Sequence, residues 1–329
     1  FYRIVDVHPC RGGLRTALSV SGKPAFAFMD NLILIAVSFT AGLLMRRFSR
    51  MPAETPVALN MFIIYVSLPA MVLNYLHGLD FRPAMFLPAS MPWLTFGLSA
   101  LFFVVAGRLL KLPRATVGAL ILCGGLGNTS FFGFPMIEAF YGKQGIVHGI
   151  IIDQLGSFMV VSILGVTVAG IYSHGKADLR SIIKRVLLFP SFLALIAAVV
   201  LNDVTYSAWF ANLVKRLSDM LAPMALFSVG FQFNPGHIGK SRNTLALGLA
   251  FKLVVVPAVM FLVYVIFAGM HGLPARITIF EAAMPTMITG GIIAAEHRLD
   301  PPLANLMVSL GLLVSFVTLA LWTVLLRGV

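Results

Sequence analysis

The sequence has few charged side chains for its length of 329 residues. Only 11% of the residues are charged, whereas a typical soluble domain carries about 25%. In contrast, 59% of the residues are hydrophobic. This composition excludes an ordinary soluble globular protein. It predicts an all-α polytopic membrane protein, because helices satisfy their own backbone hydrogen bonds inside a lipid bilayer.

Cysteine is also scarce, since only Cys10 and Cys123 occur. Two cysteines exclude a disulfide framework and a cysteine-based metal site. No H-E-x-x-H motif is present, and the seven histidines are scattered near the ends of apolar runs. We therefore expect no metal and no cofactor. The net charge of +12 comes from short clusters between apolar runs, which is typical of membrane-protein loops and argues against nucleic-acid binding.

Regular apolar runs begin at Met29, each close to the 20 or so residues that a helix needs to cross a bilayer. We predict ten membrane spans, at 30–46, 56–76, 88–109, 114–140, 147–171, 186–202, 209–232, 243–269, 274–297 and 302–326. The preceding residues 1–28 are basic and too polar to span. We interpret them as a poorly ordered N-terminal extension upstream of a start at Met29, with a membrane-surface arm as the alternative.

Lysine and arginine are concentrated in every second connection between spans. This asymmetry predicts the orientation of the chain in the membrane. One set of connections holds thirteen basic residues: Arg46, Arg47, Arg50, Arg108, Lys111, Arg114, Lys176, Arg180, Lys184, Arg185, Lys240, Arg242 and Arg298. The other set holds six: Arg82, Lys143, Lys215, Arg216, Arg276 and Arg327. Because basic loops stay in the cytoplasm, we expect the 173–185 connection inside and both termini outside. A bacterial inner membrane is the expected location.

Two of the ten spans contain clusters that an unbroken membrane helix avoids. The fourth span holds Gly124, Gly125, Gly127, Asn128, Thr129, Ser130, Gly133 and Pro135, and the ninth holds Pro285, Thr286, Gly290 and Gly291. Glycine weakens a helix by about 1 kcal/mol and an interior proline by about 3 kcal/mol. Small residues also let a second backbone approach closely. One interrupted helix in each half of a chain indicates a secondary-transporter binding site.

The two halves of the chain resemble each other weakly. Ser67–Met71 is similar to Leu221–Ala225, with proline in the third position of both, and the Leu-Pro entry to span four is similar to that of span nine. Chance similarity is the alternative for either pair. Because five spans is an odd number, two such halves have opposite orientations. We predict a 5+5 inverted repeat, 29–172 and 186–329, in which the broken helices four and nine cross.

Several motifs resemble the auxin efflux carrier family, bacterial type. Asn128-Thr129 followed by Gly133-Phe134-Pro135 resembles its N-T-x-x-x-G-x-P signature. Ala283-Met284-Pro285 resembles the ninth-helix motif, and Asp153-Gln154-Leu155-Gly156 is similar to bacterial members. The resemblance implies a scaffold of spans 1, 2, 6 and 7 and a mobile transport domain of spans 3–5 and 8–10.

The chain also departs from the PIN-type auxin exporters of this family. They have proline before the asparagine of span four, where this chain has Gly127, and they carry a long hydrophilic loop where this chain has only a short connection. These departures argue against auxin itself. The resemblance to bacterial members implies malonate, malate or a similar carboxylate.

A helix that breaks in mid-membrane presents unpaired N–H groups and the positive end of its dipole, both of which attract an anion. The second halves are expected to begin near Ser130 and Met287. We predict as substrate-binding residues Gly127, Asn128, Thr129, Ser130, Pro285, Thr286 and Met287. The alternative for Asn128 is that it only caps the broken helix. Gly133 and Pro135 are expected to break or kink the helix.

Charged residues within the predicted spans are few, and those placed deepest are Asp153, Lys252 and Glu281. Charges in membrane spans are costly and usually functional. Glu281 lies one turn before Pro285, so it could couple proton or sodium movement to the site. The alternative is a buried Glu281–Lys252 or Asp153–Lys252 pair that only fixes the transport domain. Asp219 follows Lys215 by four residues, which predicts a local ion pair.

Taken together, these features favour a secondary active transporter of a small organic anion, either a carboxylate such as malonate or malate or an auxin-like acid. Elevator-type alternating access at the crossing of helices four and nine is the expected mechanism. The alternative is a membrane-embedded receptor or enzyme that uses the same buried polar residues. We find no nucleophile–base pair, so no enzyme activity is expected. The expected partners are the substrate, the lipid bilayer, a coupling proton or sodium ion, and a second copy of the chain in a homodimer.

Overall fold

A computed structural model describes residues 23–48, 51–80, 82–173, 187–234 and 242–329. Residues 1–22 of the predicted extension, and nearly all of the predicted cytoplasmic connection, lie outside these ranges. Within them the chain is helical, with one isolated β-bridge and no strand. The all-α prediction is therefore confirmed for the described residues.

Six helical stretches are long and apolar enough to cross a membrane. They consist of α1 (Lys23–Phe48); α2 (Thr55–Phe62), η1 (Ile63–Ser67) and α3 (Leu68–Leu76); η2 (Pro83–Ser90) and α4 (Met91–Leu109); α7 (Lys143–Ile151), η4 (Ile152–Ser157), α8 (Phe158–Val160), η5 (Val161–Gly165) and α9 (Val166–Tyr172); α14 (Arg242–Ala250), η7 (Phe251–Val255), α15 (Val256–Phe261) and η8 (Leu262–Phe267); and α18 (Pro301–Leu325) with η9 (Leu326–Gly328). Each stretch coincides with a predicted span.

The other four predicted spans consist of shorter helices. They are α5 (Arg114–Gly125), η3 (Thr129–Gly133) and α6 (Phe134–Tyr141); α11 (Pro190–Val200); α12 (Ala208–Asp219) and α13 (Leu221–Gln232); and α16 (Gly272–Ala282) and α17 (Ile288–Glu296). The total of ten spans therefore stays a prediction.

Several helices contain a wide, π-type turn directly before a proline. The turns η1, η3 and η7 end two residues before Pro69, Pro135 and Pro257 respectively. A proline has no N–H to donate, and its ring pushes away the carbonyl four residues earlier. A wider turn makes room for that ring without ending the helix. These helices therefore continue through their prolines.

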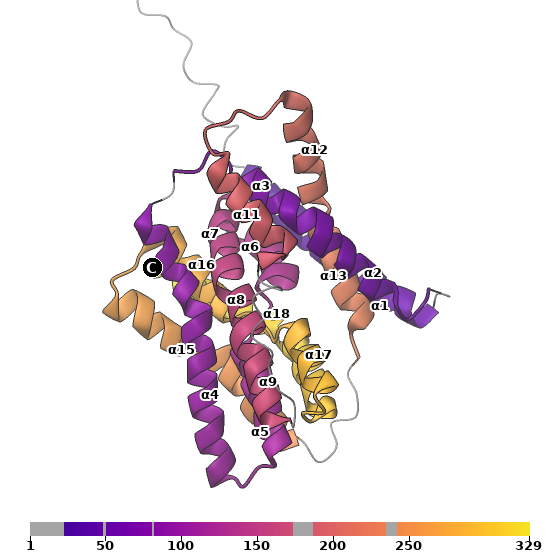
Figure 1. The fold of residues 1–329 in the computed structure, drawn as a ribbon, viewed down its shortest axis with the longest axis vertical. Helices are drawn as coiled ribbons and strands as arrows, with labels where there is room; N and C mark the ends of the chain where they lie inside the picture. The colour runs from indigo at the N-terminus through magenta and orange to yellow at the C-terminus, as the bar shows by residue number, and fades with distance from the viewer. Residues whose placement is uncertain (1–22, 49–50, 81, 174–186, 235–241) are drawn as a thin grey trace, which may run out of the picture.

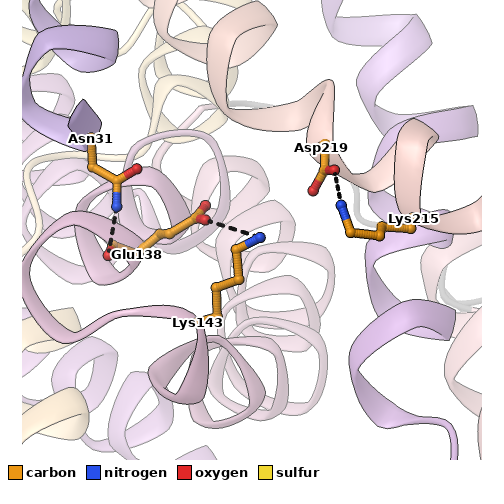
Figure 2. Close-up of polar contacts among 5 residues, drawn as sticks. All are labelled: Asn31, Glu138, Lys143, Lys215 and Asp219. Carbon is orange, nitrogen blue, oxygen red and sulfur yellow. Dashed lines mark hydrogen bonds and ion pairs between the residues drawn. The ribbon is translucent and has the colours of Figure 1, made fainter. Parts of the chain in front are cut away.

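The prediction of one continuous span over 209–232 is wrong. The chain leaves the helix at Met220, between α12 and α13. Pro223 explains the break, because its ring would clash with the carbonyl of Asp219 in a continuous helix. The predicted Lys215–Asp219 ion pair is confirmed, with an Nζ–Oδ2 distance of 2.7 Å (Figure 2).

The packing brings distant parts of the chain together. Helix α1 packs along α13, and α11 packs along α3. Helix α12 lies at one end of the molecule, and α4 and α5 meet at the opposite end (Figure 1). The interrupted elements are the most enclosed: in α5 every residue from Thr116 to Gly125 is buried, and in α16 every residue from Ile277 to Ala282 is buried. The interruptions therefore lie in the interior of the bundle.

Candidate functional site

The two interrupted helices meet where each is broken. Helix α5 ends at Gly125 and helix α16 ends at Ala282, and the two linkers that follow form an antiparallel bridge between Gly127 and Thr286. The Asn128 N–H donates to the Pro285 carbonyl at 2.8 Å, and the Met287 N–H donates to the Leu126 carbonyl at 2.9 Å. Each linker thus satisfies peptide groups that the other leaves unpaired. The predicted interruptions of both helices are present.

The break in the first helix lies close to the predicted position and before Gly133 and Pro135. The chain leaves the helix at Leu126 and resumes at Thr129, whereas Gly133 and Pro135 lie in the helical segment beyond. Pro135 stands in the first turn of α6, directly after the wide turn η3. Its effect is to widen the helix, and the interruption itself occurs at 126–128.

Asn128 is buried and caps the second half of the first broken helix. Its Oδ1 accepts a hydrogen bond from the Phe132 N–H at 3.3 Å. In the described part of the chain, no hydrogen bond of its Nδ2 is present, and the residue lines a cavity of about 500 Å³. Capping and ligand binding are therefore compatible roles, because the oxygen serves the helix and the nitrogen remains as a donor.

This larger cavity has a polar lining on several elements. Asn128 and Thr286 contribute from the bridge, and Arg46 contributes from the C-terminal end of α1. The remaining wall comes from the start of α2, from the C-terminal end of α13, from α17 and from α18, which supplies Asn305 and Ser309. Its volume lies within the range of about 300–1,000 Å³ that is usual for small-molecule sites. Arg46 is the one charged residue in the lining among the described residues.

Arg46 and Thr286 are both held in place by backbone carbonyls. The Arg46 guanidinium donates to the carbonyls of Phe231 and Phe233, at 3.1 and 3.0 Å, at the end of α13. The Thr286 hydroxyl donates to the Cys123 carbonyl at 2.9 Å. Thr286 therefore stands in the cavity wall, but its proton is already used to hold the second linker against α5.

The other predicted binding residues are separated from Asn128 and Thr286. Ser130 and Met287 line a second cavity of about 200 Å³, together with Asp153 and apolar side chains such as Phe131 and Phe158. Thr129 is 1% exposed, and its hydroxyl donates to Asp153 Oδ1 at 2.6 Å. Gly127 and Pro285 contribute backbone groups to the bridge. The structure thus divides the predicted site between two cavities.

The three predicted intramembrane charges are buried close to the bridge. Asp153 also accepts a hydrogen bond from Gln154 Nε2 at 2.8 Å. Lys252 Nζ donates to the Ala282 carbonyl at 3.1 Å. Both carboxylate oxygens of Glu281 lack a hydrogen-bond partner among the described residues.

Lys252 makes no direct ion pair with Glu281 or Asp153 among the described residues. The ion pairs in the described part of the chain are Arg82–Asp80, Lys143–Glu138 and Lys215–Asp219, all with partly or largely exposed side chains. Lys252 donates to a carbonyl and Asp153 accepts from neighbouring polar groups, so neither satisfies the other.

Sequence reasoning missed five polar residues of the larger cavity: Arg46, Gln232, Asn234, Asn305 and Ser309. Arg46 was counted only as a topology signal, whereas it lines the cavity. Asn305 and Ser309 stand four residues apart in the last apolar run, and that helical spacing places them on one face of α18. A search for polar pairs at helical spacing inside predicted spans could have found them.

Comparison with known proteins finds relatives that are named as transporters. A transporter of uncharacterized function from Methanocaldococcus jannaschii is 23% identical over 303 residues, which cover 89% of this chain and 97% of the relative. A second uncharacterized transporter, from Methanothermobacter thermautotrophicus, is 24% identical over 300 residues, or 90% and 98% of the two chains.

A shorter similarity links the chain to a plant protein. Auxin efflux carrier component 1 of Arabidopsis thaliana is 31% identical over 126 residues, which cover 38% of this chain and 20% of the plant protein. The sequence model of the membrane transport protein family matches residues 26–323. With its apolar helices and its broken-helix bridge, the chain is thus an integral membrane protein that belongs to the membrane transport protein family, the family of the auxin efflux carriers.

Proposed function

We propose that this protein is a secondary active transporter that carries a small organic anion, bound in the larger cavity at the helix crossing. The observation that carries the proposal is the position of Asn128. It caps a helix interrupted in the interior of the bundle, and it lines a cavity of about 500 Å³ with its amide nitrogen unused among the described residues. Broken helices that meet beside a cavity are typical of secondary-transporter sites.

The electrostatics of this cavity favour an anion. Helix α17 begins at Ile288, which lines the cavity, and no side chain caps its first N–H groups. The N-terminal end of a helix carries about half a positive elementary charge. Arg46 adds a full positive charge, and no acidic side chain occurs in the described lining. A carboxylate can therefore accept hydrogen bonds from Asn128 and from the first turn of α17.

The polar part of the lining fits a small dicarboxylate. Asn305 and Ser309 lie in the same cavity and offer hydrogen bonds to a second polar group of the ligand. A carboxylate such as malonate or malate has a polar group at each end. Apolar side chains such as Phe231, Phe233 and Leu312 also line the cavity, so an auxin-like acid is the alternative substrate.

We propose elevator-type alternating access with α1–α3 and α11–α13 as the scaffold. The larger cavity lies between α1 and α13 on one side and α17 and α18 on the other, which are assigned to scaffold and transport domain. Helix α1 of span one packs on α13 of span seven, and α11 of span six packs on α3 of span two. These two contacts are equivalent if the two five-span halves form an inverted repeat. Both observations support the predicted 5+5 organisation.

In the described conformation the larger cavity lies near the C-terminal end of α1, and a hydrogen bond to α6 lies near its other end. Arg46 lines the cavity near the C-terminal end of α1. Near its opposite end, Asn31 Nδ2 donates to the Glu138 carbonyl of α6 at 3.2 Å (Figure 2). Arg46 belongs to the basic connections expected in the cytoplasm. We therefore interpret the conformation as inward-facing, in a bacterial inner membrane with both termini outside.

Replacement of the asparagine tests the proposed site. Asn128→Ala removes one donor to the carboxylate, which costs about 1.5–3 kcal/mol and weakens affinity roughly tenfold to hundredfold. Binding of malonate to the purified protein should fall by that factor, while the exposed Asn243→Ala serves as the matched control. Unchanged binding in Asn128→Ala would place the site elsewhere.

The predicted coupling proton or sodium ion and the homodimer belong to the same proposal. Glu281 is the residue we assign to coupling, since it is enclosed beside the bridge without a hydrogen-bond partner among the described residues. A group in that position can change its charge when a proton or sodium ion arrives, because no protein donor holds it in one state.

A further inference from the structure

Lys252 is the buried cation nearest to the helix bridge. It lies in η7 with 1% of its surface exposed, and no carboxylate lies within ion-pair distance of its Nζ in the described residues. Its one hydrogen bond in the described structure goes to the Ala282 carbonyl, at the C-terminal end of α16. Enclosing an ammonium without a direct carboxylate contact is costly, so an anion that binds near it would be stabilised by its charge.

The ammonium stands directly against the backbone of the first linker. A Cβ atom on Gly127 would lie 3.2 Å from Lys252 Nζ. The next residue, Asn128, already lines the larger cavity. Because Gly127 has no side chain, the Lys252 ammonium can lie against the residue that directly precedes Asn128 of the cavity wall. A side chain at this position would hold the ammonium farther away.

A second glycine, Gly133, lies against the carboxylate of Glu281. A Cβ atom on Gly133 would lie 2.8 Å from both carboxylate oxygens of Glu281. Gly133 is five residues beyond Asn128 and does not line the larger cavity among its described residues. Lys252 and Glu281 thus stand against different glycines of this segment, Gly127 and Gly133, and they form no direct ion pair among the described residues.

We propose that Lys252 determines the charge selectivity of the site, as the counter-ion of the carboxylate that binds at Asn128. This inference rests on the proposed function. Arg46 is exposed and is screened by water, whereas Lys252 acts through the protein interior, where screening is weak. At an effective dielectric constant of about 20, a buried charge several ångströms from the ligand changes anion affinity on the order of 10- to 100-fold.

A structural role for Lys252 is separable from this electrostatic role. Lys252→Gln keeps a donor for the Ala282 carbonyl and removes the charge, whereas Lys252→Met removes both. If the lysine only fastens the end of α16, the glutamine variant behaves like the wild type and the methionine variant loses stability. If the charge acts on the ligand, both variants lose affinity for anions.

The test compares a dianion and a monoanion of similar shape. Malonate and its monoamide are titrated into the purified full-length protein and its variants. Because Coulomb energy scales with the charge of the ligand, Lys252→Gln should weaken malonate binding by about 10- to 100-fold and monoamide binding by a smaller factor. The exposed Lys215→Gln is the control, and it should change neither affinity.

Two glycine variants test the geometry. Gly127→Ala places a methyl group against Lys252 Nζ and should reduce the malonate preference in the same direction as Lys252→Gln. Combined with Lys252→Gln, it should add no further change in this ratio, because both act on one charge. Gly133→Ala displaces the Glu281 carboxylate instead and should leave the malonate-to-monoamide ratio unchanged.

The outcomes separate this inference from the proposed function. A wild-type ratio in Lys252→Gln, with malonate binding lost in Asn128→Ala, overturns the role of Lys252 and leaves the site in place. Malonate binding that survives Asn128→Ala overturns the site itself. Failure of the wild-type protein to bind malonate or its monoamide refutes the proposed substrate class, and with it this inference. Equal weakening of both ligands in Lys252→Gln also overturns it.

Discussion

Replacement of the buried carboxyl at position 281 separates coupling from structure. Glu281 is 1% exposed, and neither carboxylate oxygen has a hydrogen-bond partner among the described residues. Glu281→Gln preserves the size of the side chain and removes its titratable charge. Since no hydrogen bond is lost, the change should not destabilise the protein. A buried charge without a partner costs several kcal/mol and an unpaired neutral amide about 1–3 kcal/mol, so the free energy of unfolding should stay equal or increase.

The effect of Glu281→Gln on gradient-driven accumulation of substrate can be calculated. If Glu281 carries one coupling proton for each substrate, a pH difference of one unit supplies about 1.4 kcal/mol, which sustains about tenfold accumulation. Without that proton, the concentrations on the two sides become equal. Glu281→Gln should therefore reduce gradient-driven accumulation from about tenfold to none, while substrate exchange across the membrane continues.

Reconstituted vesicles allow both quantities to be measured on one preparation. Exchange is followed as the entry of labelled malonate against unlabelled malonate inside, and accumulation is followed under an imposed pH or sodium gradient. Thermal unfolding in detergent supplies the stability control. Accumulation at the wild-type level in Glu281→Gln would refute the coupling assignment. Loss of exchange together with stability would show that the carboxyl is structural.

Two further predictions concern the bridge and the topology. Thr286→Val should lower the free energy of unfolding by about 1–3 kcal/mol, because it leaves the buried Cys123 carbonyl without its donor. Thr286→Ser should retain that hydrogen bond and the stability. Equal melting temperatures of the two variants in detergent would contradict this prediction. In a cysteine-free background, Asp178→Cys should resist an impermeant thiol reagent added outside intact cells and should react after permeabilisation. This residue lies outside the described ranges. Labelling from outside would reverse the proposed orientation.

The sequence predicts the places where the membrane helices are interrupted, because Gly127, Asn128 and Pro285 have clear local effects on a helix. It does not predict which cavity each neighbour lines. Asn128 is the non-helical residue before η3 and Ser130 lies in the first turn of η3, so regular helical spacing does not place one relative to the other. The break at Met220 was not predicted, although Lys215, Arg216 and Asp219 precede it and Pro223 follows it.

The hydrogen-bond partners of the buried charges could not be predicted either. A sequence shows that Lys252, Glu281 and Asp153 share the interior, but it does not show which hydrogen-bond partner each one has. Lys252 donates to a carbonyl at the end of α16, and Asp153 accepts from Thr129 and Gln154. Such choices depend on distances of a few ångströms between helices that are far apart in the chain, and no local pattern records them.

The reciprocal bonds between the two linkers have a consequence for how such carriers diversify. The Asn128 and Met287 N–H groups and the Pro285 and Leu126 carbonyls are all main-chain groups, so these two bonds need no particular side chain. A peptide joint of this kind survives most substitutions in its neighbourhood. The surrounding side chains are then free to change and to recognise a new cargo, while the mechanical connection between the two halves of the protein is preserved.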